Sequence, residues 1–210
     1  MPQGGPAAPY RAVKRALDIG VSACAAAVGL APSIVLCAVI AADLKTNPIY
    51  SQVRVGRGGK PFVLLKFRTM LPTEDNFEET LTPEQLDSWK HERKIDDDPR
   101  VTKLGKVLRS TSIDEFPQFL NVLVGHMSIV GPRPITFEEL EEWYGDDAAE
   151  LTSVRPGLTG PWQTGPRNKA TFESGERQRI ELSYVRNMSA RYDLGLFLKT
   201  FKTVFERTGK

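Results

Sequence analysis

Residues 98–118 have the sequence DPRVTKLGKVLRSTSIDEFPQ. Apolar residues in its first half recur at helical spacing, which predicts an amphipathic helix with a basic opposite face. The apolar positions are Val101, Leu104, Val107 and Leu108, and the basic ones are Lys103, Lys106 and Arg109. Two adjacent carboxylates, Asp114 and Glu115, follow this helix and precede Pro117. The chain is therefore expected to carry its chemistry at this pair.

Two local structures are open for the carboxylate pair. In one, Ser112 is a helix N-cap and Glu115 closes a capping box. Pro117 would then be the fifth helical residue, where its ring and missing N–H break a helix. A helix that starts nearer Asp114 places Pro117 in the first turn and both carboxylates at the N-terminus, where the dipole favours an ionised carboxylate and binds phosphate. An ionised carboxylate can act as a nucleophile while its neighbour holds a divalent metal.

The same run and three later motifs resemble the bacterial sugar transferases called monotopic phosphoglycosyl transferases. These motifs are Asn121-Val122-Leu123, MSIVGPRP at 127–134 and RPGLTG at 155–160, and the resemblance extends from about Lys14 to the C-terminus. It implies transfer of a sugar-1-phosphate from a UDP-sugar to a polyprenyl (undecaprenyl) phosphate through a covalent aspartyl-phosphosugar intermediate, with release of UMP. Such a step initiates bacterial exopolysaccharide, capsule, O-antigen or glycoprotein glycan. Galactose, glucose and N-acetylated sugars are all consistent with these motifs.

The resemblance also implies roles for individual residues. Asp114 is the expected nucleophile, and Glu115, with Asp114 beside it, is the expected ligand of Mg²⁺ or Mn²⁺. The expected phosphate or nucleotide contacts are Lys66, Arg68, Arg109 and Arg133. An arginine between two prolines has little freedom and suits bidentate phosphate recognition. If these residues have no such role, Lys66 and Arg68 would lie on a solvated strand face, and Arg133 would be a solvent-facing side chain on a rigid turn.

Two residues depart from the pattern of the relatives. His126 stands where relatives usually carry an acid, and Glu181 stands where they usually carry Asp. The second exchange keeps the charge, whereas the first changes the local charge and introduces a group that titrates near neutral pH.

Residues 19–42 contain no charged side chain and are long enough to cross a membrane. Pro32 lies near their middle, and Ser33 offers a hydroxyl to the backbone groups that the proline frees. Basic residues flank both ends, so the positive-inside rule places both ends in the cytoplasm. A re-entrant helix bent at Pro32 satisfies these facts and is what the resemblance implies, and a kinked straight span is the alternative. Asp18 is expected at the interface with Lys14 or Arg15.

Periodicity outlines the remaining elements. Runs 49–55 and 62–67 predict a β-hairpin that carries Lys66, and residues 116–123 predict a short apolar helix before a buried extended segment at 127–130. Residues 137–151 and 171–186 are expected to be helical, with a loop at 155–160. The last helix, from about Leu194, has an apolar face beside Lys199 and Lys202, so it is expected to lie on an anionic membrane surface or to pack on the core.

These observations predict an α+β, mostly helical fold with amphipathic interfacial helices around a cytosolic catalytic core. Residues 1–10 are expected to be a disordered tip, 11–46 the re-entrant membrane helix, and 47–210 the catalytic domain with a membrane-associated C-terminal helix. The expected location is the cytoplasmic face of the bacterial inner membrane, as a monotopic protein. The expected partners are a UDP-sugar, a polyprenyl phosphate and the cytoplasmic leaflet, and a homo-oligomer is left open.

Several other function classes find little support. The net charge is +2, and the chain has no P-loop, no Gly-x-Gly-x-x-Gly fingerprint, no zinc pattern and no module that reads nucleic acid. A glycoside hydrolase would need carboxyl groups roughly 5 to 9.5 Å apart on both sides of a sugar, for which neighbouring residues such as Asp114 and Glu115 are poorly placed. A non-catalytic membrane scaffold for glycan assembly stays open, and it would tolerate Asp114→Asn.

Overall fold

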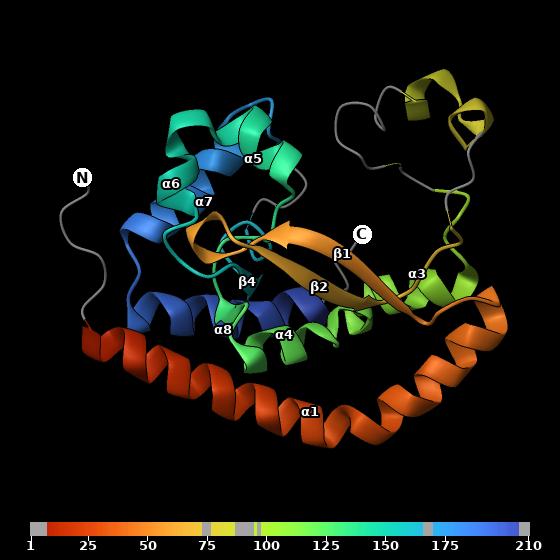
Figure 1. Cartoon of the computed structure of the whole chain (residues 1–210), viewed down its shortest axis with the longest axis horizontal. Helices are drawn as coiled ribbons and strands as arrows, with labels where there is room; N and C mark the ends of the chain where they lie inside the picture. Colours follow the sequence, from red (N-terminus) through yellow and green to blue (C-terminus); the bar gives the residue numbers. More distant parts are fainter. Residues whose placement is uncertain (1–7, 73–76, 87–94, 96–97, 166–169, 206–210) are drawn as a thin grey trace.

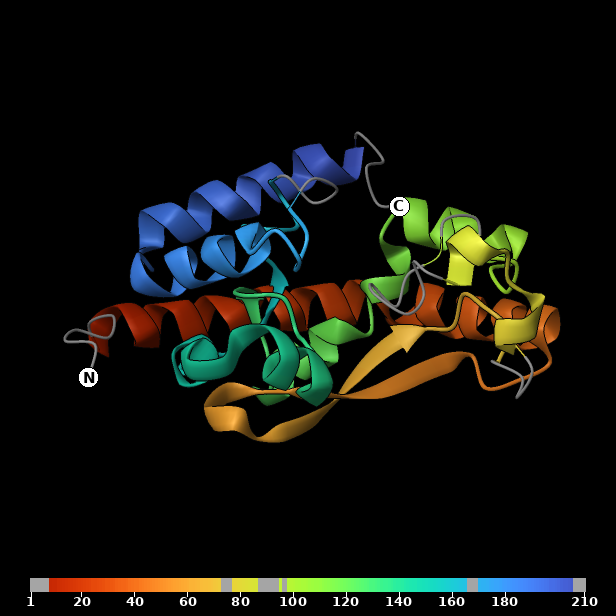
Figure 2. The same cartoon turned by 90° about the horizontal axis from the view of Figure 1, so that it is seen from above.

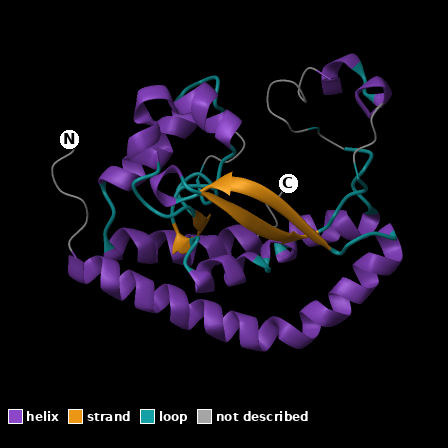
Figure 3. Cartoon of the chain, viewed as in Figure 1, coloured by secondary structure: helices purple, strands orange, loops and turns teal. Residues whose placement is uncertain are grey.

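The computed structural model describes residues 8–72, 77–86, 95, 98–165 and 170–205. The helices are α1 (Ala8–Leu44), α3 (Lys103–Ser110), α4 (Gln118–Val124), α5 (Phe137–Tyr144), α6 (Ala148–Leu151), α7 (Glu176–Arg186) and α8 (Ala190–Phe205). The strands are β1 (Ile49–Val55), β2 (Pro61–Phe67), β3 (Ser128–Val130) and β4 (Gly157–Thr159). Short 3₁₀ turns are η1 (Arg57–Gly59), η2 (Phe77–Thr80), η3 (Ile113–Glu115) and η4 (Gly145–Asp147). The prediction of a mostly helical α+β fold is confirmed (Figure 3).

Helix α1 is one long curved helix that runs along the other elements, with both of its ends turned toward them (Figure 1). The helix continues through Pro32, so the proline lies inside a bent but unbroken element. It begins at Ala8, which makes residues 8–10 of the predicted tip helical, and residues 1–7 lie outside the described part. Seen from above, α7 and α8 lie on one side of α1 and the β1–β2 hairpin on the other (Figure 2).

Polar side chains join the first turns of α1 to the rest of the chain. Lys14 donates to Asp193 of α8 at 2.6 Å and to the carbonyl of Val130 at 2.8 Å. Asp18 is 4% exposed and accepts hydrogen bonds from the Ile129 amide (2.8 Å) and the Ser128 hydroxyl (3.0 Å). Lys14 and Arg15 interact electrostatically with Asp18, as predicted, while strand β3 supplies its hydrogen-bond donors. Its position at the membrane interface stays a prediction.

The middle of α1 exposes apolar side chains. Val28, Leu30, Ile34 and Val35 are 75%, 63%, 63% and 64% exposed. Among the described residues, α1 is the one helix long and apolar enough to cross a membrane. This exposed apolar surface suggests membrane association, because water would otherwise have to solvate it.

The hairpin has the predicted position, with β1 and β2 antiparallel and Tyr50 opposite Lys66. Phe62 and Leu64 of β2 belong to a buried hydrophobic cluster that also includes Val122, Met127, Tyr184 and Leu196. Residues 155–160 were predicted to be a loop, but they contain β4, which pairs in parallel with β3. Gly157 permits this pairing, because a Cβ there would overlap the backbone of Gly131.

Two predicted helices need their boundaries corrected. Helix α7 begins at Glu176 rather than near residue 171, because Gly175 before it has a left-handed φ of 69°. The last helix begins at Ala190 rather than near Leu194. It packs one side on the core through buried Leu196, while Leu194 and Leu198 on another side are each 58% exposed. The helix therefore has buried side chains that suit packing on the core and exposed apolar side chains that suit a membrane surface, the two environments predicted for it.

Candidate active site

The carboxylate pair lies on a 3₁₀ turn between two helices. Turn η3 holds Asp114 and Glu115, and Pro117 then stands at the N-cap of α4. Ser112 has a left-handed φ of 57° and its side chain makes no cap hydrogen bond, so the capping box is not formed. The alternative, a helix beginning near Asp114 with Pro117 in its first turn, is partly confirmed: a 3₁₀ turn begins at Ile113, but α4 itself begins only after Pro117. The tight turn places both carboxylates beside strand β2.

Glu115 contacts the hairpin directly. Its Oε1 accepts from the Nζ of Lys66 at 2.8 Å, and both side chains are about one-quarter exposed. Lys66 therefore lies at the carboxylate pair rather than on a solvated strand face. Its predicted role as a phosphate contact stays a prediction. Since this ion pair is partly shielded from water, it is stronger than a fully exposed pair would be.

Asp114 is the more buried of the two carboxylates, with 8% of its surface exposed. Burial raises the pKa of its carboxyl to about 6, Lys66 acts to lower this pKa, and the Glu115 carboxylate acts to raise it. The expected N-terminal helix dipole does not dominate here, because η3 is a single turn and desolvation is the larger effect. A carboxyl with this pKa is still mostly ionised at pH 7, and it is a stronger base than an ordinary aspartate.

Two of the predicted basic contacts lie away from Glu115. Arg109 donates from Nε to the Thr69 hydroxyl at 2.9 Å, and its charge lowers the pKa of Asp114. Arg68 donates to the carbonyl of Asn47 at 2.7 Å, and its guanidinium lies 5.7 Å from the centre of the Tyr50 ring. The structure thus brings Arg109 into the electrostatic environment of Asp114 and places Arg68 just after β2, where it contacts Asn47 and Tyr50.

A narrow cleft opens beside the carboxylate pair. Its lining residues come from the hairpin, α4, the loop after β3, and β4 with the segment after it: Arg54, Leu64, Lys66, Glu115, Gln118, Arg133, Pro134, Gly157, Leu158 and Gln163. The cleft therefore brings together three predicted site residues, Lys66, Glu115 and Arg133. The sequence prediction missed Arg54, Gln118 and Gln163 as site residues. Strand alternation places Arg54 on the same face as Lys66, which is the signal that could have identified it.

Arg133 has a rigid backbone and a cationic head without an acidic partner among the described residues. Its backbone N–H donates to Oε1 of Glu181 at 3.3 Å, and its guanidinium lies 5.1 Å from the centre of the Trp162 ring. Glu181 is 1% exposed, and burial raises its pKa to about 7. Arg177, the neighbouring buried cation, has its pKa lowered to about 10 by burial and by the charge of Arg133. Glu181, which stands where relatives usually carry Asp, is therefore a buried side chain that holds the loop containing Arg133.

The carboxylate pair offers ligands that suit Mg²⁺ or Mn²⁺. Asp114 and Glu115 both supply carboxylate oxygens, which are hard donors, and Mg²⁺ is usually held by one or two carboxylates together with water and substrate phosphates. No cluster of three or more His, Cys, Asp or Glu side chains occurs in the described residues. The donor set therefore fits a cation that the diphosphate of a substrate would help to bind, rather than a closed structural metal site.

Comparison with known proteins gives a consistent result over almost the whole chain. A family model described as bacterial sugar transferase matches residues 9–207. The UDP-galactose-lipid carrier transferase of Erwinia amylovora is 38% identical over 202 residues, which cover 95% of this chain and 42% of that protein. The exopolysaccharide production protein ExoY of Sinorhizobium fredii is 43% identical over 74% of this chain and 69% of its own length. The undecaprenyl-phosphate galactose phosphotransferase of Salmonella typhimurium is 40% identical over 77% of this chain and 34% of its own length. The chain thus spans about two-fifths of the length of the Erwinia relative.

Proposed function

The chain belongs to the bacterial sugar transferase family, and we propose that it transfers a sugar-1-phosphate from a UDP-sugar to a polyprenyl phosphate such as undecaprenyl phosphate. The observation that carries this proposal is the position of Asp114, which is buried next to Glu115 and within the field of Lys66. These two neighbours form an ion pair that lines the same cleft as Arg133. A carboxylate in such a cationic site suits attack on phosphorus. The product would initiate assembly of a bacterial polysaccharide or related glycan.

The proposed reaction has two displacements at the same phosphorus. In the first, an Asp114 oxygen attacks the sugar-proximal phosphorus of the UDP-sugar, and the bond to UMP breaks with its electron pair leaving on the UMP oxygen. In the second, a phosphate oxygen of the polyprenyl phosphate attacks that phosphorus, and the Asp114 carboxylate departs. The products are UMP and a polyprenyl diphosphate sugar, and Asp114 is regenerated.

The other cleft residues would bind and orient the phosphates. Lys66 and Arg133 both line the cleft, so their charges can offset those of the diphosphate. Arg109 lies near enough to Asp114 to lower its pKa, which keeps the nucleophile ionised. Arg68 contributes to the hairpin rather than to the cleft, so we do not assign it a phosphate. Asp114 and Glu115 would hold Mg²⁺, which when bound neutralises diphosphate charge.

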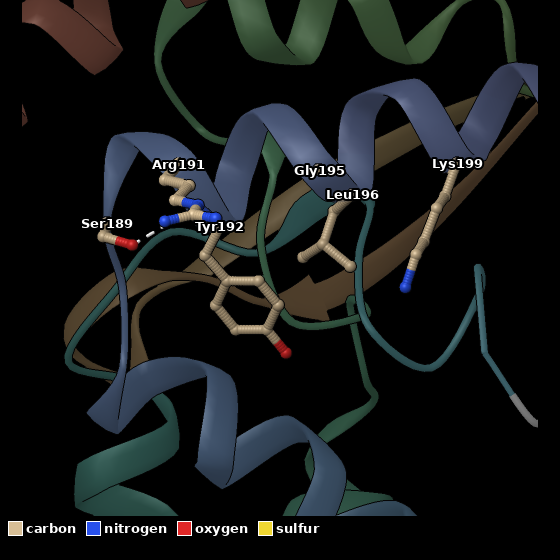
Figure 4. A pocket seen from close by; sticks show the side chains of 6 residues that line it. All are labelled: Ser189, Arg191, Tyr192, Gly195, Leu196 and Lys199. Atoms are coloured by element: carbon tan, nitrogen blue, oxygen red, sulfur yellow. Dashed lines mark hydrogen bonds between the residues drawn. The ribbon is translucent and has the colours of Figure 1, made fainter.

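The proposed location is the cytoplasmic face of the bacterial inner membrane. The exposed apolar part of α1 would enter the bilayer, and both ends of the curved helix face the rest of the chain (Figure 1). On α8, a surface depression of about 330 Å³ is lined by residues that include Arg191 and Lys199 (Figure 4). Exposed Leu194 and Leu198 on the same helix suit the interface of an anionic membrane, where basic and apolar side chains both bind.

Cysteine labelling tests this membrane arrangement. Single cysteines near Tyr10 and near Asn47, in a chain whose Cys24 and Cys37 are replaced, should both react with an impermeant reagent from the cytoplasmic side only. Labelling of the two positions from opposite sides would establish a straight span in place of the re-entrant helix.

UMP release tests the proposed activity. The full chain in detergent, with Mg²⁺ and undecaprenyl phosphate, should release UMP from one member of a panel containing UDP-galactose, UDP-glucose and N-acetylated UDP-sugars. UDP-galactose is the first choice, given the names of two relatives. Asp114→Asn should lower the rate by more than about 10³-fold, because the nucleophile is lost. If the Asp114→Asn variant still supports glycan assembly in cells, the alternative of a non-catalytic membrane scaffold would be favoured.

A further inference from the structure

We infer that the Arg133 end of the cleft holds the UMP part of the donor, and that the side-chain amide of Gln163 reads the uracil edge. This inference rests on the proposed function, because it assigns one end of the same cleft to one half of the UDP-sugar. Gln163 was not among the residues that the sequence predicted for the site, and it lies outside the motif at 155–160. It reaches the cleft because the chain after β4 turns back toward Arg133.

Charge orients the donor in the cleft. Two groups are attached to the phosphorus that Asp114 attacks, a neutral sugar and an anionic UMP. The guanidinium of Arg133 has no acidic partner among the described residues and lines the same cleft as Arg54. Arg54 is partly neutralised by Glu139, which lies 3.1 Å from it, so Arg133 carries the larger uncompensated charge at this end. The anionic half of the donor is therefore expected at Arg133, with the sugar directed away from it.

The polar atoms of Gln163 match the next part of the nucleotide. Its side chain lines the cleft, and its Oε1 lies buried beside Gly160 without a hydrogen-bond partner among the described residues. Rotation of the side-chain amide would turn this oxygen toward a ligand in the cleft. A buried acceptor without a donor costs free energy, and a ligand that supplies the donor removes this cost. The N3–H of uracil is such a donor, and the uracil O4 beside it can accept from the Nε2 group of the same amide.

Two carboxamides that can distinguish one base from another line the cleft, those of Gln118 and Gln163. We assign the base to Gln163 because it follows Trp162, whose ring contacts the guanidinium of Arg133. Pro134 and Leu158 supply apolar contacts in this cleft and carry no side-chain hydrogen-bonding group. Trp162 lies beneath the guanidinium of Arg133 and near that of Arg177, at 5.1 and 4.4 Å from the ring centre. The ring thus contacts Arg133, the cation at this end of the cleft, and the base is placed at Gln163.

The experiment compares UMP with N3-methyl-UMP, which lacks the hydrogen-bond donor. Inhibition constants are measured for both nucleotides against UDP-sugar turnover, with the full chain and with Gln163→Ala. The wild-type protein should bind UMP about tenfold more tightly than N3-methyl-UMP, and Gln163→Ala should reduce this ratio to about one. Thr164→Val is the matched control, because Thr164 belongs to the same segment but hydrogen-bonds to the Gly160 carbonyl and does not line the cleft. It should keep the wild-type ratio.

Two results would overturn the inference while leaving the proposed function intact. One is an unchanged ratio in Gln163→Ala, and the other is an equal collapse of the ratio in Thr164→Val, which would trace the effect to the loop rather than to the amide. If the wild-type protein neither turns over a UDP-sugar nor binds UMP, both the proposed function and this inference fail.

Discussion

The side-chain oxygen of Asn121 accepts the backbone N–H of Leu65 at 3.0 Å, which joins helix α4 to the open edge of strand β2. The amide nitrogen of Asn121 completes the pairing by donating to the Val63 carbonyl at 2.7 Å. One buried side chain thus takes the place that a third strand would occupy. Because Lys66 follows Leu65 and the carboxylate pair precedes α4, this contact sets the separation between the lysine and Glu115.

Asn121→Leu should therefore affect both stability and catalysis. The substitution leaves the Leu65 N–H and the Val63 carbonyl without their partner, at a cost of roughly 2–4 kcal/mol in the free energy of unfolding. The turnover number should fall more than the affinity for the UDP-sugar, because Lys66 and Glu115 lose their alignment while Arg133 stays in place. Denaturant unfolding and steady-state kinetics measure the two effects. Wild-type values for both would show that Asn121 does not position the site.

Lys66→Met should change the pH dependence of the first displacement. Lys66 acts to lower the pKa of Asp114, so its removal should raise that pKa above about 6. The nucleophile must be ionised, and the rate is therefore lost as the pH falls through this pKa. Single-turnover UMP release should show a larger defect at pH 6 than at pH 8, whereas Lys66→Arg should show a smaller pH-dependent defect. An equal defect at both pH values would mean that Lys66 acts only by contacting substrate.

The packing of α1 against the site can be tested with two glycines of the same helix. A Cβ at Gly29 would overlap the ring of Phe116, the residue after Glu115, whereas a Cβ at Gly20 meets no atom within 4 Å. Gly20→Ala should be neutral or should stabilise the protein by up to about 1 kcal/mol, as alanine favours a helix. Gly29→Ala should instead cost about 1–3 kcal/mol and reduce UMP release. Thermal unfolding in detergent and the release assay separate the two variants, and equal behaviour would contradict the close approach of α1 to the site.

The sequence predicted local elements better than the contacts among them. The hairpin at 49–55 and 61–67 is confirmed because strand alternation and the intervening glycines are local signals. The structure of the carboxylate pair was not predicted, since a left-handed backbone at a serine such as Ser112 has no signal in the local sequence. The hydrogen bonds of Asp18 with β3 and the position of Gln163 in the cleft were missed for the same reason. They join positions far apart in the chain, and no spacing rule reports such contacts.

The covalent intermediate is the central claim, and intact-protein mass spectrometry tests it most directly. The full chain should be mixed with Mg²⁺ and a UDP-sugar that it turns over, in the absence of polyprenyl phosphate. The account predicts a mass increase equal to one phosphosugar, located on Asp114, absent from Asp114→Asn, and lost when undecaprenyl phosphate is added. UMP release that requires the acceptor, with no adduct formed in its absence, would contradict a two-step mechanism through Asp114.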